Sequence, residues 1–453
     1  MLNQRAHVAI VGGGFSGTLL AINLLRHDGP RVTLIERRQD QLARGVAYGS
    51  ARPDHLLNVR AGGMSAFPDD PAHFERWLGA RAAGRSPFVR RRLYGLYLRE
   101  LLAQVAADTD HRLRVIHGEV TDVIEADGRL RLVMDEAPAI EADTVVLSVG
   151  NLPPAIPTGV GLEALDGGAY VDDPWSLGPD GAPDIRGRTL LIGTGLTAVD
   201  VLLDLDGRGL AGEVFALSRR GLLARAHDLG QPAVTAAALP DARRLSQLTR
   251  RVRMRARAIG WRSAIDELRP VTHQLWWRAD HATRRRFLRH LRPYWDVHRH
   301  RLAPEAMQRV QGIEAAGRFR AEAGQLLGVE RSPDGLNVRW RPRGTSEVRT
   351  LQVDRIINCT GVHGDLSRSD QPLLQNLVGR GVIRPDRLGL GIDTDAACRT
   401  VDAAGVANRS LYCIGPMTRG AFWEMTAVPD LRRQAWMIAR RLANAHWMGG
   451  EGL

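Results

Sequence analysis

The order of apolar and polar residues at the start of the chain predicts a strand, a glycine turn, a helix and a second strand. An apolar run at 8–11 leads into the glycine-rich residues 12–17. Apolar side chains then recur at helical spacing through 15–22, and a second apolar run at 32–35 ends on Glu36. This order is typical of the βαβ unit of a dinucleotide site.

Each glycine of this turn has a physical role in such a unit. Gly12 permits the tight turn, Gly14 lets backbone N–H groups approach a pyrophosphate, and Gly17 lets the helix lie close to the strand. The helix N-terminus adds unpaired N–H donors and the positive end of its dipole. Glu36 stands where a carboxylate accepts hydrogen bonds from ribose hydroxyls. A glycine turn without a nucleotide is the alternative, but strand, helix and acid all favour the dinucleotide.

The same order recurs from residue 189. An apolar run at 189–192 leads into the turn at 193–198, where Ala198 replaces the third glycine, as the fingerprint tolerates. The strand that follows leads to Arg219 instead of an acid. A guanidinium pairs with a 2′-phosphate, whereas a carboxylate repels it, so we predict a site for NADPH. If Arg219 is only a solvent-facing charge, NADH remains possible.

Further apolar runs predict the rest of the sheets. Three of them end in glycine: 144–149 before Gly150, 353–360 before Gly361, and 411–414 before Gly415. Alternating positions over 113–133 predict antiparallel strands. Thr426 is expected to cap a C-terminal helix over 431–445.

Residues 225–320 are predicted to be helical and are rich in Arg, His and Trp. Within 284–304, Pro293 is expected to kink or break the helix. His298 shares a predicted apolar face of this stretch with leucine and tryptophan side chains. A histidine in that position is either a core residue or a catalytic candidate.

Composition limits the possible functions. A chain of 453 residues predicts two or three domains. The formal charge is +12 and every basic residue is arginine. No nucleic-acid motif accompanies these arginines, so we expect a site for an anionic small molecule and no nucleic-acid partner.

The three cysteines are far apart, which excludes a CxxC dithiol and predicts no metal site. No apolar stretch is long enough to cross a bilayer, so no membrane partner is expected. The glycines that interrupt the first apolar run argue against a signal peptide. We therefore expect a cytoplasmic protein.

These features together resemble the two-dinucleotide-binding-domain flavoproteins, and within them an FAD/NAD(P)-binding group of bacterial oxidoreductases. The stretches that carry the resemblance are GGGFSG at 12–17, GVAYG at 45–49, LLNV at 56–59 with Met64, RRLYGLYL at 91–98, FLRHLRPYWDVHRHR at 287–301 and GAFWEMTAVPDLRRQA at 420–435.

The resemblance implies an α/β fold with two Rossmann-like dinucleotide-binding domains and a helical insertion over the cleft. The FAD domain is expected to be discontinuous, from 1–155 and 345–453, with the NAD(P) domain at 156–344 and the helical segment at 225–320. The residues expected to contact FAD are Gly12, Gly14, Phe15, Ser16, Gly17, Glu36, Asn58, Met64, Val120, Gly415 and Thr426. Those expected to contact NADPH or NADH are Gly193, Thr194, Gly195, Leu196, Thr197 and Arg219.

Two departures from related flavoproteins bear on the reaction. The F-x-G-x-x-x-H motif of Baeyer–Villiger and flavin monooxygenases is absent from 168–175, and Pro416 follows Gly415 where aspartate is common. We therefore favour hydroxylation of a small polar or anionic substrate, urate-like by analogy, over oxygenation of a ketone. Reduced FAD would bind dioxygen as a C4a-(hydro)peroxyflavin.

His298 and Arg301 are the catalytic candidates for this reaction, with Trp295 and Trp423 as apolar walls. The first alternative is an NAD(P)H-dependent reductase or dehydrogenase that inserts no oxygen. The second is a non-catalytic flavin-binding scaffold or redox sensor. The sequence leaves the oligomeric state open.

Overall fold

The chain forms two compact units, each built around its own sheet. The computed structural model describes residues 6–26, 29–49, 52, 55–81, 86–109, 111–165, 168–175, 186–229 and 244–443. The first unit comprises Met1–Pro53, Val59–Leu152 and His363–Leu453, and the second comprises Asp54–Asn58 and Pro153–Val362. The predicted α/β class is therefore confirmed, and the first unit is built from three separate stretches of the chain.

The first unit contains a six-stranded sheet in the order β15-β16-β7-β1-β2-β3. Its strands are β1 (His7–Val11), β2 (Arg31–Glu36), β3 (Leu113–His117), β7 (Thr144–Leu147), β15 (Arg399–Val401) and β16 (Ala407–Cys413). All neighbours pair in parallel except the edge strand β15. The carboxyl ends of β16, β7, β1 and β2 therefore share one edge.

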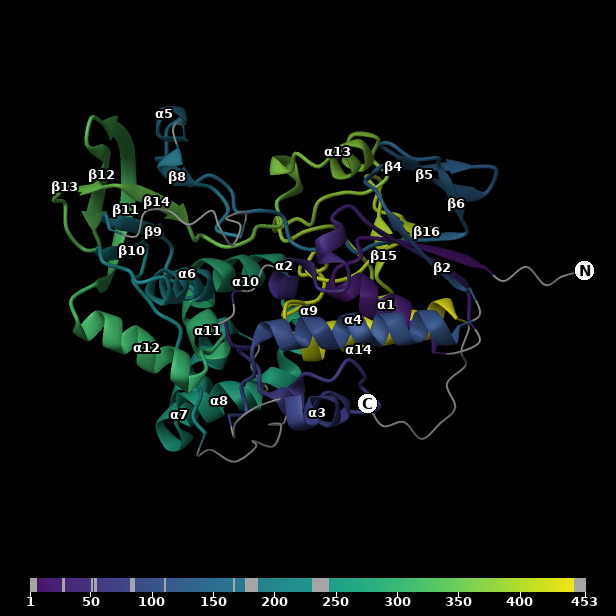
Figure 1. Cartoon of the computed structure of the whole chain (residues 1–453), viewed down its shortest axis with the longest axis horizontal. Coiled ribbons are helices and arrows are strands. Elements are labelled where there is room, and N and C mark those ends of the chain that lie inside the picture. Colours follow the sequence, from purple (N-terminus) through teal and green to yellow (C-terminus); the bar gives the residue numbers. More distant parts are fainter. Residues whose placement is uncertain are drawn as a thin grey trace, which may run out of the picture. The chain divides into compact units, whose positions relative to one another are not determined.

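Strand β1 lies in the middle of this sheet because it is apolar on both faces. Val8, Ala9, Ile10 and Val11 are all buried, as expected for a parallel strand covered on both sides. Helix α1 (Phe15–Leu25) packs against α4 (Arg91–Asp108) and α14 (Val428–Leu442), as Figure 1 shows. The two ends of the chain thus build one core.

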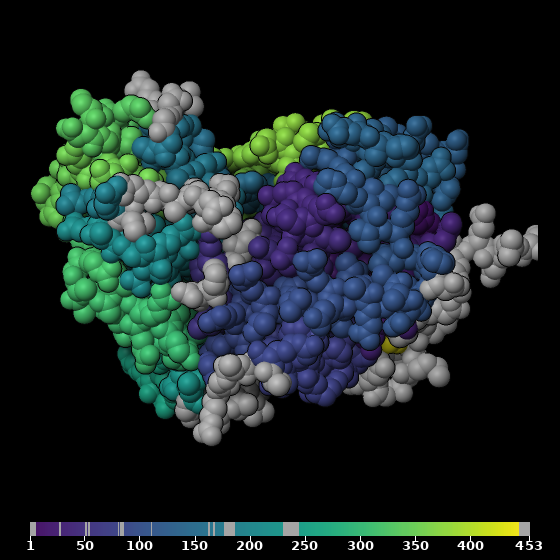
Figure 2. Space-filling model, viewed as in Figure 1, coloured from purple at the N-terminus to yellow at the C-terminus, as the bar shows by residue number. Residues whose placement is uncertain are grey.

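Smaller elements complete the first unit. A three-stranded antiparallel sheet joins β4 (Val120–Ala126), β5 (Arg129–Met134) and β6 (Ile140–Ala142), and its hairpin turns through Asp127 and Gly128, both at positive φ. The short helices are η1 (Gln39–Gln41), α2 (Gly45–Gly49), η2 (Ala61–Gly63), α3 (His73–Leu78), η3 (Gly79–Arg81), η7 (Leu366–Arg368) and α13 (Pro372–Gly379). Part of the surface of this unit is visible in Figure 2, where α4 is blue.

The second unit contains a seven-stranded sheet in the order β13-β12-β11-β10-β9-β14-β8. Its strands are β8 (Tyr170–Val171), β9 (Thr189–Ile192), β10 (Val214–Ser218), β11 (Phe319–Ser332), β12 (Gly335–Pro342), β13 (Arg349–Val353) and β14 (Arg355–Asn358). Strands β8, β14, β9, β10 and β11 pair in parallel, and β12 and β13 continue the sheet in antiparallel fashion.

The helices of the second unit are mostly short. They are α5 (Leu162–Leu165), α6 (Leu196–Gly207), α7 (Leu245–Ile259), α8 (Trp261–Leu268), η5 (Arg269–Val271), α9 (Thr272–Arg278), α10 (His281–Arg286), η6 (Phe287–Leu291), α11 (Arg292–Arg299) and α12 (Pro304–Ala315). The predicted helical character of 225–320 holds between 245 and 315, but residues 225–229 contain no helix and β11 already starts at Phe319. Residues 230–243 of that segment lie outside the described residues.

Two boundaries differ from the sequence-based expectation. The chain returns to the first unit only at His363, later than the expected residue 345, because β13 and β14 complete the second sheet. Asp54–Asn58 also groups with the second unit. Among the helices that the structure describes, none combines the length and apolarity needed to cross a bilayer.

Candidate functional site

The first glycine turn follows β1 at the carboxyl edge of the first sheet. Gly12 has a φ of 104°, and its N–H donates to the carbonyl of Ile35 at 2.9 Å. A Cβ atom on Gly12 would lie 2.2 Å from the carbonyl oxygen of Ser148, and one on Gly17 would lie 2.0 Å from that of Gly12. The packing of the chain itself therefore requires glycine at both positions.

Gly14 lacks a side chain for a different reason. A Cβ atom there would come no closer than 3.5 Å to its nearest neighbour, Cα of Gly45. Its φ of −70° and ψ of −161° suit any residue, and it is the N-cap of α1. The missing side chain leaves the backbone at the helix N-terminus open, which is the arrangement that an anion requires.

Two polar side chains surround this turn. The Glu36 carboxylate accepts hydrogen bonds from the backbone N–H of Gly13 at 2.9 Å and of Arg38 at 3.0 Å, one on each oxygen. Ser148 follows β7, and its buried hydroxyl has no hydrogen-bond partner among the described residues. A buried hydroxyl without a partner is costly unless a ligand or water completes it.

The second turn repeats the geometry of the first. Gly193 has a φ of 123°, and its N–H donates to the carbonyl of Leu217 at 2.8 Å. A Cβ atom on it would lie 2.2 Å from the carbonyl oxygen of Cys359, whereas one on Gly195 would meet nothing within 4 Å. Gly195 is the N-cap of α6, so this turn also combines a required first glycine with an open second one.

This equivalence shows which residue replaces Glu36 in the second unit. The N–H of Gly12 donates to the carbonyl of Ile35, the residue before Glu36. In the same way, the N–H of Gly193 donates to the carbonyl of Leu217, the residue before Ser218. Ser218 therefore occupies the place of the acid, whereas the sequence alone indicates Arg219. The strand register locates it, because Glu36 and Ser218 each directly follow the last residue of the second strand that pairs with the first, Ile35 opposite Val11 and Leu217 opposite Ile192.

Ser218 and Thr194 join the two loops at this edge. Their hydroxyls lie 2.8 Å apart, and Ser218 Oγ also accepts from the N–H of Gly221 at 3.0 Å. Arg219 is exposed and has no hydrogen bond or ion pair with another described residue. Arg220, in contrast, donates to the hydroxyl of Tyr294 at 3.0 Å and stacks on its ring.

The other residues expected around the cofactors occupy varied places. Ser16 is buried in the first turn of α1, and the Phe15 ring contacts the ring of Tyr48. Met64 and Val120 are buried in the first unit, whereas Asn58 belongs to the second. Leu196 and Thr197 form the half-buried first turn of α6.

The C-terminal residues differ from one expectation. Gly415 is buried after β16, at the same sheet edge as Gly12. Thr426 does not cap α14: the helix starts at Val428 with Ala427 as N-cap, and no side chain caps it. The N–H of Leu431 donates to the carbonyl of Ala427 at 3.0 Å, so the helix starts past Thr426, and Pro429 is accommodated in its first turn because the missing N–H needs no partner there.

His298 lies at the end of α11 among cationic side chains. Its ring stacks on that of Trp261 with centroids 5.2 Å apart. Burial lowers the pKa of His298, and the charges of three neighbouring arginines, Arg225, Arg301 and Arg262, lower it further. The imidazole is therefore neutral at pH 7.

Arg301 is a structural anchor in the second unit. Its guanidinium donates to the carbonyl of His298 at 2.6 Å, to Asp266 at 2.9 Å and to the carbonyl of Arg262 at 2.9 Å. It is 5 % exposed, so little of it is left for a substrate. Of the two expected apolar walls, Trp295 belongs to the second unit and Trp423 to the first.

The three cysteines offer no reactive thiol. Cys359, Cys398 and Cys413 are buried and free. Burial raises the pKa of Cys398 to about 12 and that of the other two well above the usual range. A thiolate is the reactive form of cysteine, so these side chains are inert at neutral pH. The described residues contain no cluster of His, Cys, Asp and Glu that could hold a metal ion.

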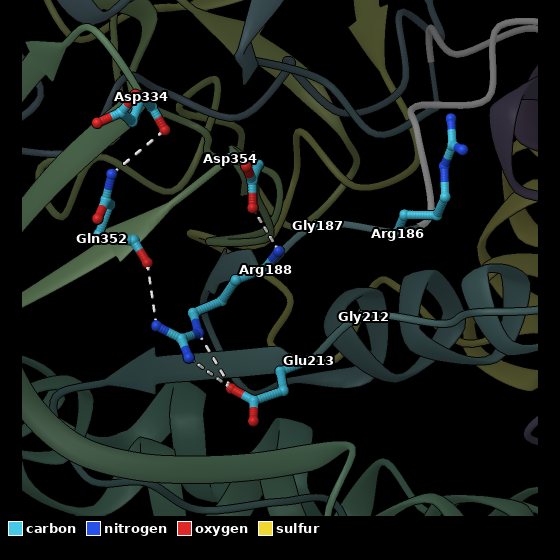
Figure 3. A pocket seen from close by; sticks show the side chains of 8 residues that line it. All are labelled: Arg186, Gly187, Arg188, Gly212, Glu213, Asp334, Gln352 and Asp354. Carbon is cyan, nitrogen blue, oxygen red and sulfur yellow. Dashed lines mark hydrogen bonds and ion pairs between the residues drawn. The ribbon is translucent and has the colours of Figure 1, made fainter.

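A polar hollow of 440 Å³ lies in the second unit at the opposite edge of the sheet (Figure 3). Its lining includes Arg188, Glu213 and Asp354, which directly precede β9, β10 and β14. Arg188 binds Glu213 at 3.0 Å, and its backbone N–H donates to Asp354 at 2.6 Å. Ligands of such sheets bind at the carboxyl ends of the strands, so this amino-terminal hollow is not the cofactor site.

Comparisons with known proteins agree with this geometry. Residues 9–152 match the family model described as FAD-NAD(P)-binding. No curated protein sequence matches the chain. The structure of the Kutzneria sp. 744 ornithine N-hydroxylase KtzI, with reduced FAD, NADP+ and L-ornithine, is similar with a TM-score of 0.67 and 17 % identity, covering 97 % of this chain and 99 % of that one.

Two further structures are similar over nearly the whole chain. The L-lysine 6-monooxygenase from Pseudomonas syringae has a TM-score of 0.64 and 18 % identity, covering 97 % of this chain and all (100 %) of that one. The cadaverine monooxygenase DfoA from Erwinia amylovora, bound to FAD, has a TM-score of 0.66 and 11 % identity, covering 98 % and 95 %. The chain therefore has the fold of the two-dinucleotide-binding-domain flavoproteins.

Proposed function

We propose that this protein is an FAD-dependent, NADPH-consuming monooxygenase that hydroxylates a small molecule. The observation that carries the proposal is the repeated turn. Gly12 and Gly193 are required by the chain's own packing, whereas Gly14 and Gly195 leave open backbone at a helix N-terminus. Two such turns in one chain are the arrangement needed to bind two dinucleotides.

The first turn fits FAD. The Glu36 carboxylate is half exposed and accepts only one hydrogen bond on each oxygen, so both oxygens keep lone pairs for ribose hydroxyls. Ser148, whose buried hydroxyl has no partner among the described residues, lies at the same edge of the sheet, because its backbone lies against Gly12. Gly14 leaves the N-terminus of α1 accessible to the diphosphate.

The second turn fits NADPH. Ser218 replaces the acid that would repel a 2′-phosphate, and Arg219 beside it is exposed and without a described partner. A guanidinium forms charge-assisted hydrogen bonds with a phosphate, so Arg219 could bind the 2′-phosphate of NADPH. Arg220 is already bound to Tyr294, so it is the matched control for Arg219.

When bound, FAD would accept hydride from NADPH and activate dioxygen, and the chain's own task is to bind, orient and exclude water. We propose that the neutral imidazole of His298 accepts a proton from the substrate. Arg301 would position this imidazole through its hydrogen bond to the backbone carbonyl of His298. Small amines are the first substrates to test, because the three similar structures are those of amine hydroxylases. Neither the structure nor these likenesses support a urate-like substrate.

The cofactor choice is tested by binding and reduction. The purified protein should take up FAD, and its flavin should be reduced faster by NADPH than by NADH. Arg219→Ala should weaken NADPH binding by at least tenfold, in line with about 1.5–3 kcal/mol for a charged hydrogen bond, and leave NADH binding unchanged. Ser218→Glu should shift the preference to NADH, and Arg220→Ala should change neither. A wild-type preference for NADH would contradict the assignment.

The reaction is tested by following NADPH and oxygen consumption together during a screen of amines. Amine-dependent oxygen uptake with a product heavier by one oxygen atom supports the monooxygenase. Fast turnover with artificial acceptors and no oxygenated product would instead indicate a reductase. Absence of turnover with every acceptor would indicate a scaffold. If His298→Gln retains wild-type turnover, the histidine is a core residue.

A further inference from the structure

We propose that Gln434 is a positioning residue for the flavin: its buried amide clamps the Gly415 turn against the first turn of α1. This inference rests on the proposed function, because it assumes that α1 binds FAD. Gln434 lies on α14, far from the glycine motif in sequence, and is 6 % exposed.

Every hydrogen-bonding atom of the Gln434 amide has a partner. Oε1 accepts from the backbone N–H of Gly415 at 2.7 Å. Nε2 donates to Thr418 Oγ1 at 3.0 Å and contacts Cys398 Sγ at 3.5 Å. Because a backbone N–H can only donate, Oε1 has to face Gly415, and this fixes the orientation of the amide.

Thr418 closes the arrangement into a ring. Its hydroxyl donates to the carbonyl of Gly415 at 2.8 Å, and it is fully buried. The hydroxyl therefore gives its proton to Gly415 and accepts from Gln434. Gly415 is held by its N–H through Gln434 and by its carbonyl through Thr418, so the turn has little freedom to move.

The turn that is held this way touches the helix that we assign to the diphosphate. Gly415 has a φ of 83°, and a Cβ atom on it would lie 2.8 Å from Ser16 Oγ and 3.2 Å from Ser16 Cβ. Ser16 is the second residue of α1. The Gly415 backbone therefore forms one wall beside the open N-terminus of the helix.

This wall acts by its shape and offers no hydrogen-bond donor. The N–H of Gly415 is already bound to Gln434, and Pro416 has none. A flavin that meets this turn consequently finds a fixed surface. Loosening the clamp would let Gly415 move and would misplace the first turn of α1, where the N–H donors for the diphosphate are.

The test compares FAD affinity with stability. Gln434→Leu removes all hydrogen bonds of the amide while keeping a side chain of similar size, and should weaken FAD binding at least tenfold in a fluorescence titration of the apoprotein. Thr418→Val should weaken it similarly, whereas Thr418→Ser keeps the hydroxyl and should bind FAD like the wild type. NADP+ affinity, which belongs to the second unit, should stay unchanged in all three.

The matched control is Asn408→Leu. Asn408 lies at the other end of β16, where its amide donates to the carbonyl of Val382 at 2.9 Å and to Thr400. This variant should lose thermal stability like Gln434→Leu but keep wild-type FAD affinity. If Gln434→Leu does not fold, the comparison of FAD affinity between Thr418→Val and Thr418→Ser tests the proposal.

The two proposals fail in different ways. If the wild type takes up no FAD, the proposed function is wrong, and so is the proposed role of Gln434. If the wild type binds FAD and Thr418→Val and Gln434→Leu bind it equally well, only the clamp is wrong. Equal loss of FAD affinity in Asn408→Leu would also overturn it, because the effect would then be general destabilisation.

Discussion

The two glycines of the second turn are needed for different reasons: Gly193 for the packing of the chain and Gly195 for access to the backbone. Gly193 is fixed by its φ of 123° and by the carbonyl of Cys359, which leaves no room for a Cβ atom. Gly195 has ordinary dihedral angles and open space around it. A methyl group at 193 therefore disturbs the chain, while one at 195 disturbs only what approaches from outside.

This contrast gives a prediction for the alanine variants. Gly193→Ala should lower the free energy of unfolding by more than about 2 kcal/mol, from backbone strain and overlap. Gly195→Ala should retain the wild-type melting temperature but weaken NADP+ binding about tenfold, or ~1.4 kcal/mol. Gly312→Ala, on α12 and equally open, is the control: it should leave NADP+ binding unchanged and, as a helix-interior position, raise the free energy of unfolding by about 1 kcal/mol. Unchanged NADP+ affinity in Gly195→Ala would contradict a diphosphate at this turn.

The residues that the sequence identifies are those whose environment is local. Gly12, Gly17 and Glu36 follow from a strand, a turn and a helix within a single stretch. Ser148 reaches this turn from the end of β7, and Gln434 reaches the neighbouring Gly415 turn from α14, so neither contact follows from the glycine stretch itself. Contacts between such distant segments depend on strand order, which periodicity alone does not determine.

At the scale of elements, the sequence predicts strands better than their partners. The apolar run ending before Gly361 falls within the expected first domain, 345–453, and resembles the run before Gly150. The two strands are indeed equivalent, but in different sheets: β7 lies beside β1, and β14 lies beside β9. The likeness reflects repetition of the same unit, which also explains the late return of the chain to the first unit.

The helical segment around Pro293 changes its winding where the sequence predicts a kink or a break. Residues 287–291 form a π-helical turn, and α11 starts at Arg292 with Pro293 in its first turn. In that position the missing N–H costs nothing and the fixed φ suits the helix. The apolar face expected across 284–304 is therefore divided between two helices, and His298 lies on the second.

This placement predicts a small effect for Pro293→Ala. Alanine gives the unfolded chain more freedom without relieving strain in the folded one, so the free energy of unfolding in urea should fall by about 0.4–1 kcal/mol. Pro304→Ala, at the start of α12, should behave alike. A gain in stability would show instead that Pro293 strains a helix that runs through it.

At the scale of the whole molecule, the charge is unevenly distributed. Residues 244–301 contain 16 arginines and 4 acidic residues, and the rest of the chain has 46 of each. The whole formal charge of +12 thus belongs to the helical segment of the second unit, although the arginines look scattered along the sequence. His298 lies inside this segment, which is why neighbouring arginines contribute to its lowered pKa.

Four histidines make the stability of the protein depend on pH. Burial is the largest cause that lowers the pKa of His7, His73, His298 and His363 below the ordinary value of 6.5. Near and below pH 6.5 the unfolded chain therefore binds more protons than the folded one, and the free energy of unfolding falls as the pH falls. The pKa of His363 is lowered by burial and by the charge of Arg368, and its Nδ1 accepts from the N–H of Asp365 at 3.2 Å, a hydrogen bond that protonation would break.

We expect the melting temperature to be steady from pH 8 to about 7 and to decrease progressively from about pH 6.5 to 5, where these histidines titrate in the unfolded chain. His363→Asn keeps a side-chain acceptor that does not titrate, so it should flatten part of this decrease. His117→Asn, at an exposed histidine of β3, is the control and should leave the slope as it is. Added salt should reduce the loss further, because it screens the arginines around His298. A melting temperature that rises between pH 7 and 5 would mean that these histidines gain protons on folding, opposite to what their burial requires.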